Sequence, residues 1–380
     1  MAVIAKTNRP LYRAYLLKVP SVDAPMAAKI REARMIVLGK TNTPEFGMLP
    51  VTESALNGIC HNPWDPQLTA GGSSGGAAAS VAAGITALAH GTDGAGSLRI
   101  PAACCGVFAV VPGPGALPAV QRPTLAGMPR EGVISRTVGD AVLFLQAMKA
   151  LGPGEVVRSP ATHRFEGMKV IAASSPPIEC TVDPGCVAAM WGVADVLSNA
   201  GCEVVDATPD WYSDRILNDM MILRSSIPVG YGDPDESLLD RTTLMTLTIA
   251  KGTSMAEMHR ALVRSHTYAS RAVSILGEDS VLMTPTTART RLPHGWVTEP
   301  DNPEELFKRA AAFAPFTALA NLAGLCAVSL PIRSASDEHP VGVQLMAKPA
   351  MFPGILRLAA TVEQHGSWCF GVANSDRSHS

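Results

Sequence analysis

The feature that most constrains the fold is a pair of glycine- and serine-rich turns, each followed directly by a segment of helical composition. GGSSGG at 71–76 runs into AAASVAAG, and HGTDGAGS at 90–97 runs into LRIPAACCG. A flexible Gly/Ser linker would lack the apolar residues at helical spacing that follow the first turn. The small residues of both turns also permit backbone conformations and close approaches that larger side chains block. We therefore assign both turns to a folded core.

Strand-like and helix-like segments alternate along the rest of the chain. Apolar runs typical of buried strands occur at 2–6, 35–38, 168–173, 202–207, 281–284, 327–331 and 341–346. Helical patterns occur at 21–34, 77–88, 184–199, 254–276 and 355–365. This alternation indicates βαβ units. The sequence therefore predicts an α/β fold with a mixed, mostly parallel sheet covered by helices on both faces. We expect one large domain over 1–380, in which the weakly periodic region 208–303 varies and faces the substrate.

The composition limits the classes of function. Of the 380 residues, 47% are hydrophobic and 17% are charged, with a formal net charge of -2. This net charge gives no indication of the basic surface that binding to nucleic acid or to an anionic membrane would require. No apolar run is long enough to span a bilayer. The eight cysteines lack CxxC spacing and the histidines do not cluster, so we expect no metal site. Reduced core thiols and the lack of a signal peptide predict a cytoplasmic location.

Around these turns the sequence resembles the amidase signature family. The matching motifs are NPWDP at 62–66, GGSSGG at 71–76 and GTDGAGSLRIPAACCG at 91–106. Further matches lie at 22–47, at SRTVGD (135–140), at MTP (283–285) and along 316–347. The resemblance covers most of the chain and implies the amidase signature fold with a Ser-Ser-Lys catalytic triad. It also implies that the chain is short at its N-terminus relative to the family.

The resemblance assigns roles to residues within the two turns. Ser97 matches the nucleophile that forms the acyl-enzyme, and Ser73 matches the bridging serine that follows a cis peptide bond. Gly94, Ala95, Gly96 and Ser97 match the oxyanion hole, with Ala95 in place of the usual glycine. Consecutive backbone N–H groups on a turn of small residues suit the stabilisation of a developing negative charge.

Three further polar residues are expected to support this site. Asp93 and Arg99 flank the nucleophile turn and carry opposite charges, so we expect them to pair and to hold the turn in place. Ser74 lies beside the bridging serine and is expected to support it.

The catalytic base is expected to be a lysine outside the two turns. A serine hydroxyl is a poor nucleophile at neutral pH until a base takes its proton. A lysine can act as this base once burial and neighbouring dipoles have removed its own proton. The resemblance implies a lysine at the end of an apolar strand, which is Lys6 of AVIAK, although Thr7 replaces the usual aspartate. Lys40 of GKTNTPEFG is the alternative base.

The sequence thus predicts an amidase that hydrolyses a small or medium carboxamide to a carboxylate and ammonia or an amine through an acyl-enzyme on Ser97. No cofactor is implied, and a small amide is the only partner required, although a homodimer is compatible with the sequence. Two alternatives remain. One is a catalytically impaired relative with a shortened N-terminus. The other is a glutamine amidotransferase subunit, which would need partner subunits.

Overall fold

The protein is built on one large mixed sheet with a small two-stranded sheet beside it. The computed structural model describes residues 2–5, 22–120, 128–152, 165–232, 234–333, 339–365 and 367–370. The strands of the large sheet are β1 (Ala2–Ala5), β2 (Ile36–Lys40), β5 (Leu88–Asp93), β6 (Phe108–Val111), β7 (Arg130–Ser135), β8 (Lys169–Ala172), β9 (Glu203–Asp206), β10 (Ser280–Pro285), β11 (Cys326–Arg333) and β12 (Pro340–Ala347). The small sheet pairs β3 (Glu53–Ser54) with β4 (Gly58–Ile59).

The ten strands are ordered β2-β1-β5-β7-β6-β11-β12-β10-β8-β9. Pairing is parallel at the two ends of the sheet and antiparallel from β5 to β10. The expected α/β fold with a mixed sheet is confirmed, but the sheet is less parallel than the alternation of segments indicates. The reason is that no helix lies between β6 and β7, or between β11 and β12, among the described residues, and strands without a crossover helix pair antiparallel.

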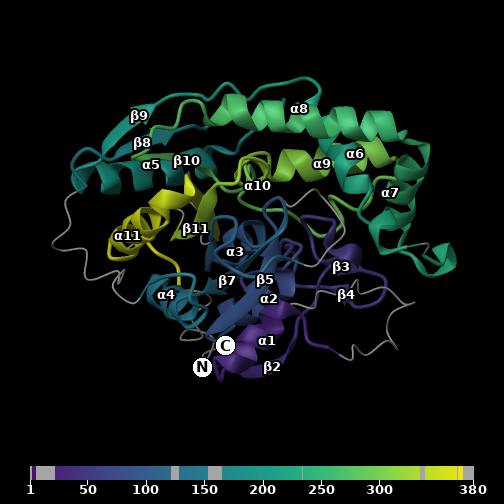
Figure 1. The fold of residues 1–380 in the computed structure, drawn as a ribbon, viewed down its shortest axis with the longest axis horizontal. Helices are drawn as coiled ribbons and strands as arrows, with labels where there is room; N and C mark the ends of the chain where they lie inside the picture. Colours follow the sequence, from purple (N-terminus) through teal and green to yellow (C-terminus); the bar gives the residue numbers. More distant parts are fainter. Residues whose placement is uncertain are drawn as a thin grey trace.

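Helices cover both faces of this sheet (Figure 1). They are α1 (Pro25–Glu32), α2 (Gly75–Ala82), α3 (Arg99–Cys105), α4 (Val138–Ala147), α5 (Pro184–Asn199), α6 (Ile216–Ser225), α7 (Arg241–Gly252), α8 (Met255–Val273), α9 (Pro303–Phe313), α10 (Ala318–Leu322) and α11 (Phe352–Glu363). Buried side chains of α1, α4, α5 and α11 pack in one cluster on one face. Helices α2, α3, α8 and α10 pack on the other, where α6 and α9 also gather with α8.

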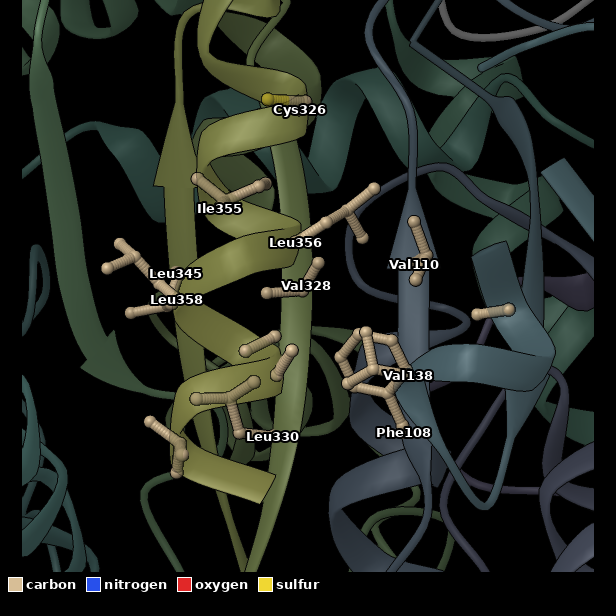
Figure 2. Close-up of a cluster of buried hydrophobic side chains, with 14 of the residues drawn as sticks. Phe108, Val110, Val138, Cys326, Val328, Leu330, Leu345, Ile355, Leu356 and Leu358 are labelled. Carbon is tan, nitrogen blue, oxygen red and sulfur yellow. The ribbon is translucent and has the colours of Figure 1, made fainter. Parts of the chain in front are cut away.

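Neighbouring residues of each central strand alternate between the two cores. Figure 2 shows Leu356 of α11 beside Val328 of β11, in the core cluster that also contains Leu358 and Leu330. Ala327, the residue before Val328, belongs instead to the core on the opposite face. This period-two alternation of buried residues is what a strand between two helical layers requires.

Most of the predicted elements are present with boundaries shifted by a few residues, and two regions differ more. The helix predicted at 184–199 is α5 with the same ends. The helix predicted at 77–88 is wrong at its C-terminal end, because α2 ends at Ala82 and β5 begins at Leu88. Residues 208–253, where only weak periodicity is visible, contain α6 and α7.

The described part of the chain contains neither a membrane span nor a metal site. No helix in it combines the length and the apolar character needed to cross a bilayer. No group of three or more His, Cys, Asp or Glu side chains among those same residues is arranged to hold a metal ion. All eight cysteines are free thiols.

Candidate active site

The fold brings the two glycine- and serine-rich turns into direct contact. One turn precedes α2 and carries Ser73 and Ser74, and the other connects β5 to α3 and carries Ser97. The backbone N–H of Ser74 donates a hydrogen bond of 3.1 Å to the carbonyl oxygen of Ser97. Ser97 is half-buried, whereas Ser73 and Ser74 are buried. The two serines to which the sequence assigns catalytic roles therefore lie side by side, with Ser97 nearer to solvent.

The turn that carries Ser73 is fixed by a hydroxyl from a neighbouring loop. The Thr52 hydroxyl donates to the carbonyl oxygen of Gly71 at 2.8 Å and accepts from the N–H of Gly75 at 3.1 Å. Between these two contacts, the peptide bond from Gly72 to Ser73 is cis, as the resemblance implies. Thr52 is a positioning residue that the sequence analysis missed, because its partners lie in a different part of the chain.

Asp93 organises the nucleophile turn. Its carboxylate accepts hydrogen bonds from the backbone N–H of Gly96 at 2.7 Å and of Leu98 at 3.1 Å. It also pairs with the Arg99 guanidinium at 2.9 and 3.1 Å, and both side chains are fully buried. Burial by itself would raise the pKa of Asp93, but the Arg99 charge and these hydrogen bonds lower it well below the usual carboxyl range. The carboxylate is therefore charged at neutral pH and closes the turn onto α3.

Arg99 connects this turn to strands and helices from the last third of the chain. Its guanidinium donates to the side-chain oxygens of Gln344 at 2.9 Å and Asn321 at 2.7 Å. The Asn321 amide donates in turn to the carbonyl oxygen of Asp93 at 2.7 Å, and the Gln344 amide donates to the Thr284 hydroxyl at 2.8 Å. Neither Asn321 nor Gln344 belongs to a site predicted from the sequence. The available signal was a single amide within each of the mostly apolar runs NLAGLCAVSLP and PVGVQLMA.

Replacement of Asp93 by asparagine is expected to destabilise the fold by about 3–5 kcal/mol, because the buried Arg99 cation loses its counter-charge. Because folding lowers the pKa of Asp93, its contribution is present at neutral pH and is lost only as the pH falls below the ordinary carboxyl range. Urea unfolding at pH 7 measures the difference. Asp195→Asn, on the exposed surface of α5, is the matched control. A loss no larger than that of the control would show that Asp93 does not carry this stabilisation.

The predicted oxyanion donors differ in their availability. The N–H groups of Gly94, Ala95 and Ser97 have no hydrogen-bond acceptor among the described residues, whereas the N–H of Gly96 is already engaged by Asp93. Ala95 has no positive φ, so alanine fits where the family usually has glycine. Gly96 has φ +113°, and a Cβ there would lie 2.4 Å from the Thr317 hydroxyl. Within the described structure, three of the four predicted donors are thus without an acceptor, and the assignment of the oxyanion hole stays a prediction.

An apolar cavity lies beside this turn, and Ala95 lines it. Helix α6 contributes Ile216 and Met220 to its lining, and α9 contributes Phe307. The other lining residues are also apolar except for one, Arg224 in the last turn of α6. Helix α6 lies within the region 208–303 that was expected to face the substrate, whereas α9 follows it. The arrangement places room for an apolar group next to the free N–H donors.

The two lysines that are candidates for the catalytic base, Lys6 and Lys40, follow or end neighbouring strands of the sheet. Strand β1 ends at Ala5, which pairs with His90 of β5 on one side and with Lys40 of β2 on the other. Lys6 follows Ala5 and lies outside the described residues. Lys40 is exposed at the end of edge strand β2.

Comparison with known families identifies the class of this site. A family model described as amidase matches residues 12–351. The chain belongs to the amidase family. This amidase is accordingly a carbon–nitrogen hydrolase that acts on amides.

Individual relatives agree with this assignment. The amidase is 33% identical to an indoleacetamide hydrolase of Bradyrhizobium japonicum over 372 residues, which cover 90% of this chain and 76% of the relative. It is similar to a solved structure of 6-aminohexanoate cyclic dimer hydrolase complexed with substrate, with TM-score 0.83 and 26% identity over 95% of this chain and 84% of the other. One of the subunits of a glutamyl-tRNA(Gln) amidotransferase from Thermotoga maritima matches with TM-score 0.78 and 25% identity over 96% and 82% of the two chains.

Proposed function

We propose that this amidase hydrolyses a small or medium carboxamide through an acyl-enzyme on Ser97. The observation that carries the proposal is the contact between the two turns, in which the Ser74 N–H binds the Ser97 carbonyl oxygen. This contact brings the turn of the buried Ser73 against the turn of the half-buried Ser97, and Ala95 of the second turn lines an apolar cavity. A nucleophile, a proton relay and unoccupied N–H donors at one place are the components that acyl transfer requires.

The proposed reaction uses Ser73 to connect Ser97 with the base. The Ser97 oxygen attacks the amide carbon while its proton passes to Ser73, and the Ser73 proton passes to neutral Lys6. The N–H groups of Gly94, Ala95 and Ser97 stabilise the oxyanion. The C–N bond then breaks, and the proton returns through Ser73 to the leaving amine. Water attacks the acyl-enzyme, which releases the carboxylate and restores the Ser97 hydroxyl.

The cavity supports an acyl group with apolar character. Side chains such as Ile216, Met220 and Phe307 give the space beside Ala95 an apolar lining. Apolar surface transferred from water into such a cavity contributes to substrate binding. We therefore propose that the acyl group occupies this cavity and that α6, within the region 208–303, is its substrate-facing wall.

A serine-directed fluorophosphonate probe tests the proposal directly. We expect stoichiometric labelling, with the adduct located on Ser97 by peptide mass spectrometry, because only an activated serine attacks phosphorus rapidly. The Ser97→Ala variant should take up no probe. A wild-type protein that is folded by circular dichroism and remains unlabelled would instead indicate a catalytically impaired relative.

A further inference from the structure

Arg224 is the one charged residue among the described residues that line the cavity beside the nucleophile turn. It lies in the last turn of α6 and is half-buried. The rest of the lining consists of aliphatic, proline, methionine and phenylalanine side chains. A cation in such surroundings loses much of its hydration, which costs free energy unless a partner of opposite charge replaces the water.

The guanidinium of Arg224 has no such partner in the part of the protein that the structure describes. Its one hydrogen bond there goes to the carbonyl oxygen of Met48. No carboxylate of a described residue lies within ion-pair distance of it. Arg99 and Arg264 differ from it, since each pairs with an aspartate. Arg130, which is also buried, donates to three backbone carbonyl oxygens rather than to one. Burial lowers the pKa of Arg224 to about 10, so the side chain is still a cation at neutral pH.

A structural role accounts for only part of this arrangement. The bond to Met48 fastens α6 to the loop before β3, and a cation suits the C-terminal end of a helix. Neither role requires the side chain to line a cavity that also reaches Ala95. A guanidinium carries several N–H donors in a planar fork, and one carbonyl oxygen leaves most of them available for a planar anion.

We infer that Arg224 recognises a carboxylate on the acyl portion of the substrate, so that the preferred substrates are monoamides of dicarboxylic acids. The inference rests on the proposed function, because it places the reacting amide at Ser97 and the carboxylate at the Arg224 end of the same cavity. The apolar walls between the two ends accept the methylene chain. The described lining of the cavity has no acidic residue to receive an ammonium group, so an anionic amide without an amino group fits better than glutamine.

The test compares two substrates of the same shape. Monoamides of linear dicarboxylic acids with four to seven carbons cover the plausible chain lengths. For the six-carbon acid, the probe is adipamate, and its apolar isostere is 6-methylheptanamide, in which two methyl groups replace the carboxylate oxygens. We expect the wild-type protein to prefer the carboxylate-bearing amide of the best chain length by at least about tenfold in kcat/KM, and glutamine to be a poorer substrate than the five-carbon monoamide.

Three variants locate the source of this preference. Arg224→Met keeps the length of the side chain and should abolish the preference, whereas Arg224→Lys keeps one charge and should retain part of it. Arg215→Met removes an exposed charge at the start of α6 and should leave the ratio as in the wild type. The ratio of the two substrates cancels any loss that affects both. A wild-type preference for the apolar isostere, or an Arg224→Met variant with an unchanged ratio, would overturn the inference.

A binding measurement separates this inference from the proposed mechanism. Calorimetry with adipamate and 6-methylheptanamide on the Ser97→Ala protein reports recognition without turnover. If the carboxylate-bearing amide binds more tightly but the wild-type protein hydrolyses neither compound, the acyl-enzyme proposal fails and the role of Arg224 stands. If both compounds are hydrolysed and bound without discrimination, the role of Arg224 fails and the mechanism stands.

Discussion

Replacement of Ser97 by alanine is expected to lower kcat/KM for amide hydrolysis by about 10⁴- to 10⁶-fold, the range found when a catalytic serine or its partners are removed from serine hydrolases. The variant keeps the backbone N–H groups of the turn but has no oxygen that can attack the amide carbon. Steady-state assays with a chromogenic anilide measure the loss, and active-site titration of the wild type fixes the concentration of competent enzyme.

Two further measurements make this result specific to Ser97. The variant should unfold at nearly the same urea concentration as the wild type, because the Ser74–Ser97 contact involves only backbone atoms. Ser198→Ala removes an exposed hydroxyl from α5 and should retain full activity. If Ser97→Ala retains more than a few per cent of the wild-type rate, Ser97 is not the nucleophile.

Replacement of Lys6 by alanine is expected to lower kcat/KM to within about tenfold of the Ser97→Ala value, because members of one proton-transfer unit are not additive. Without a base, the Ser97 proton has no acceptor and the leaving amine has no donor. Lys6→Arg should be equally inactive, because a guanidinium keeps the positive charge but does not give up its proton near neutral pH. The same anilide assay, run from weakly acidic to alkaline pH, measures both variants.

Lys40→Ala is the matched control for this prediction. Lys40 pairs with Ala5 across β1 and β2, but it is exposed, so its removal should change kcat/KM by less than about twofold, as for surface substitutions in general. A normal rate for Lys6→Ala together with a large loss for Lys40→Ala would exchange the two assignments. Full activity of Lys6→Arg would show that the residue acts through its charge rather than as a base.

The sequence was sufficient to predict contacts where a motif, or a short separation along the chain, brings the interacting residues together. The proximity of the turns that carry Ser73 and Ser97 was expected only from the resemblance to the amidase signature family, which gives the two serines roles in one triad. The pairing of Asp93 with Arg99 was also predictable, since the two charges flank a single turn. By contrast, the hydrogen bond from the Gly96 N–H to Asp93 depends on the conformation of that turn, and no sequence pattern predicts it.

Long-range partners explain what the sequence left out. Strand β5 contains His90 and Asp93, which obscure a strand pattern, but His90 binds Glu131 of β7 at 2.6 Å in the interior. The hydrophobic periodicity of helix α6 is weak because different sides of the helix make different contacts. Met220 and Arg224 line the cavity, while Asp219 binds Arg264 of α8. In both elements a polar residue is satisfied by a neighbour far away in the chain.

The hydrogen bonds from Arg99 to Asn321 and Gln344 also have a consequence for the stage of chain synthesis at which the nucleophile turn gains its support. Ser73 and Ser97 are synthesised early, but the side chains that secure the nucleophile turn belong to α10 and β12. A nascent chain that has not yet added these elements contains both serines without the support of the turn. We therefore expect the serine chemistry proposed above to lack these supporting side chains until α10 and β12 have been synthesised, and an interrupted chain to be left without them.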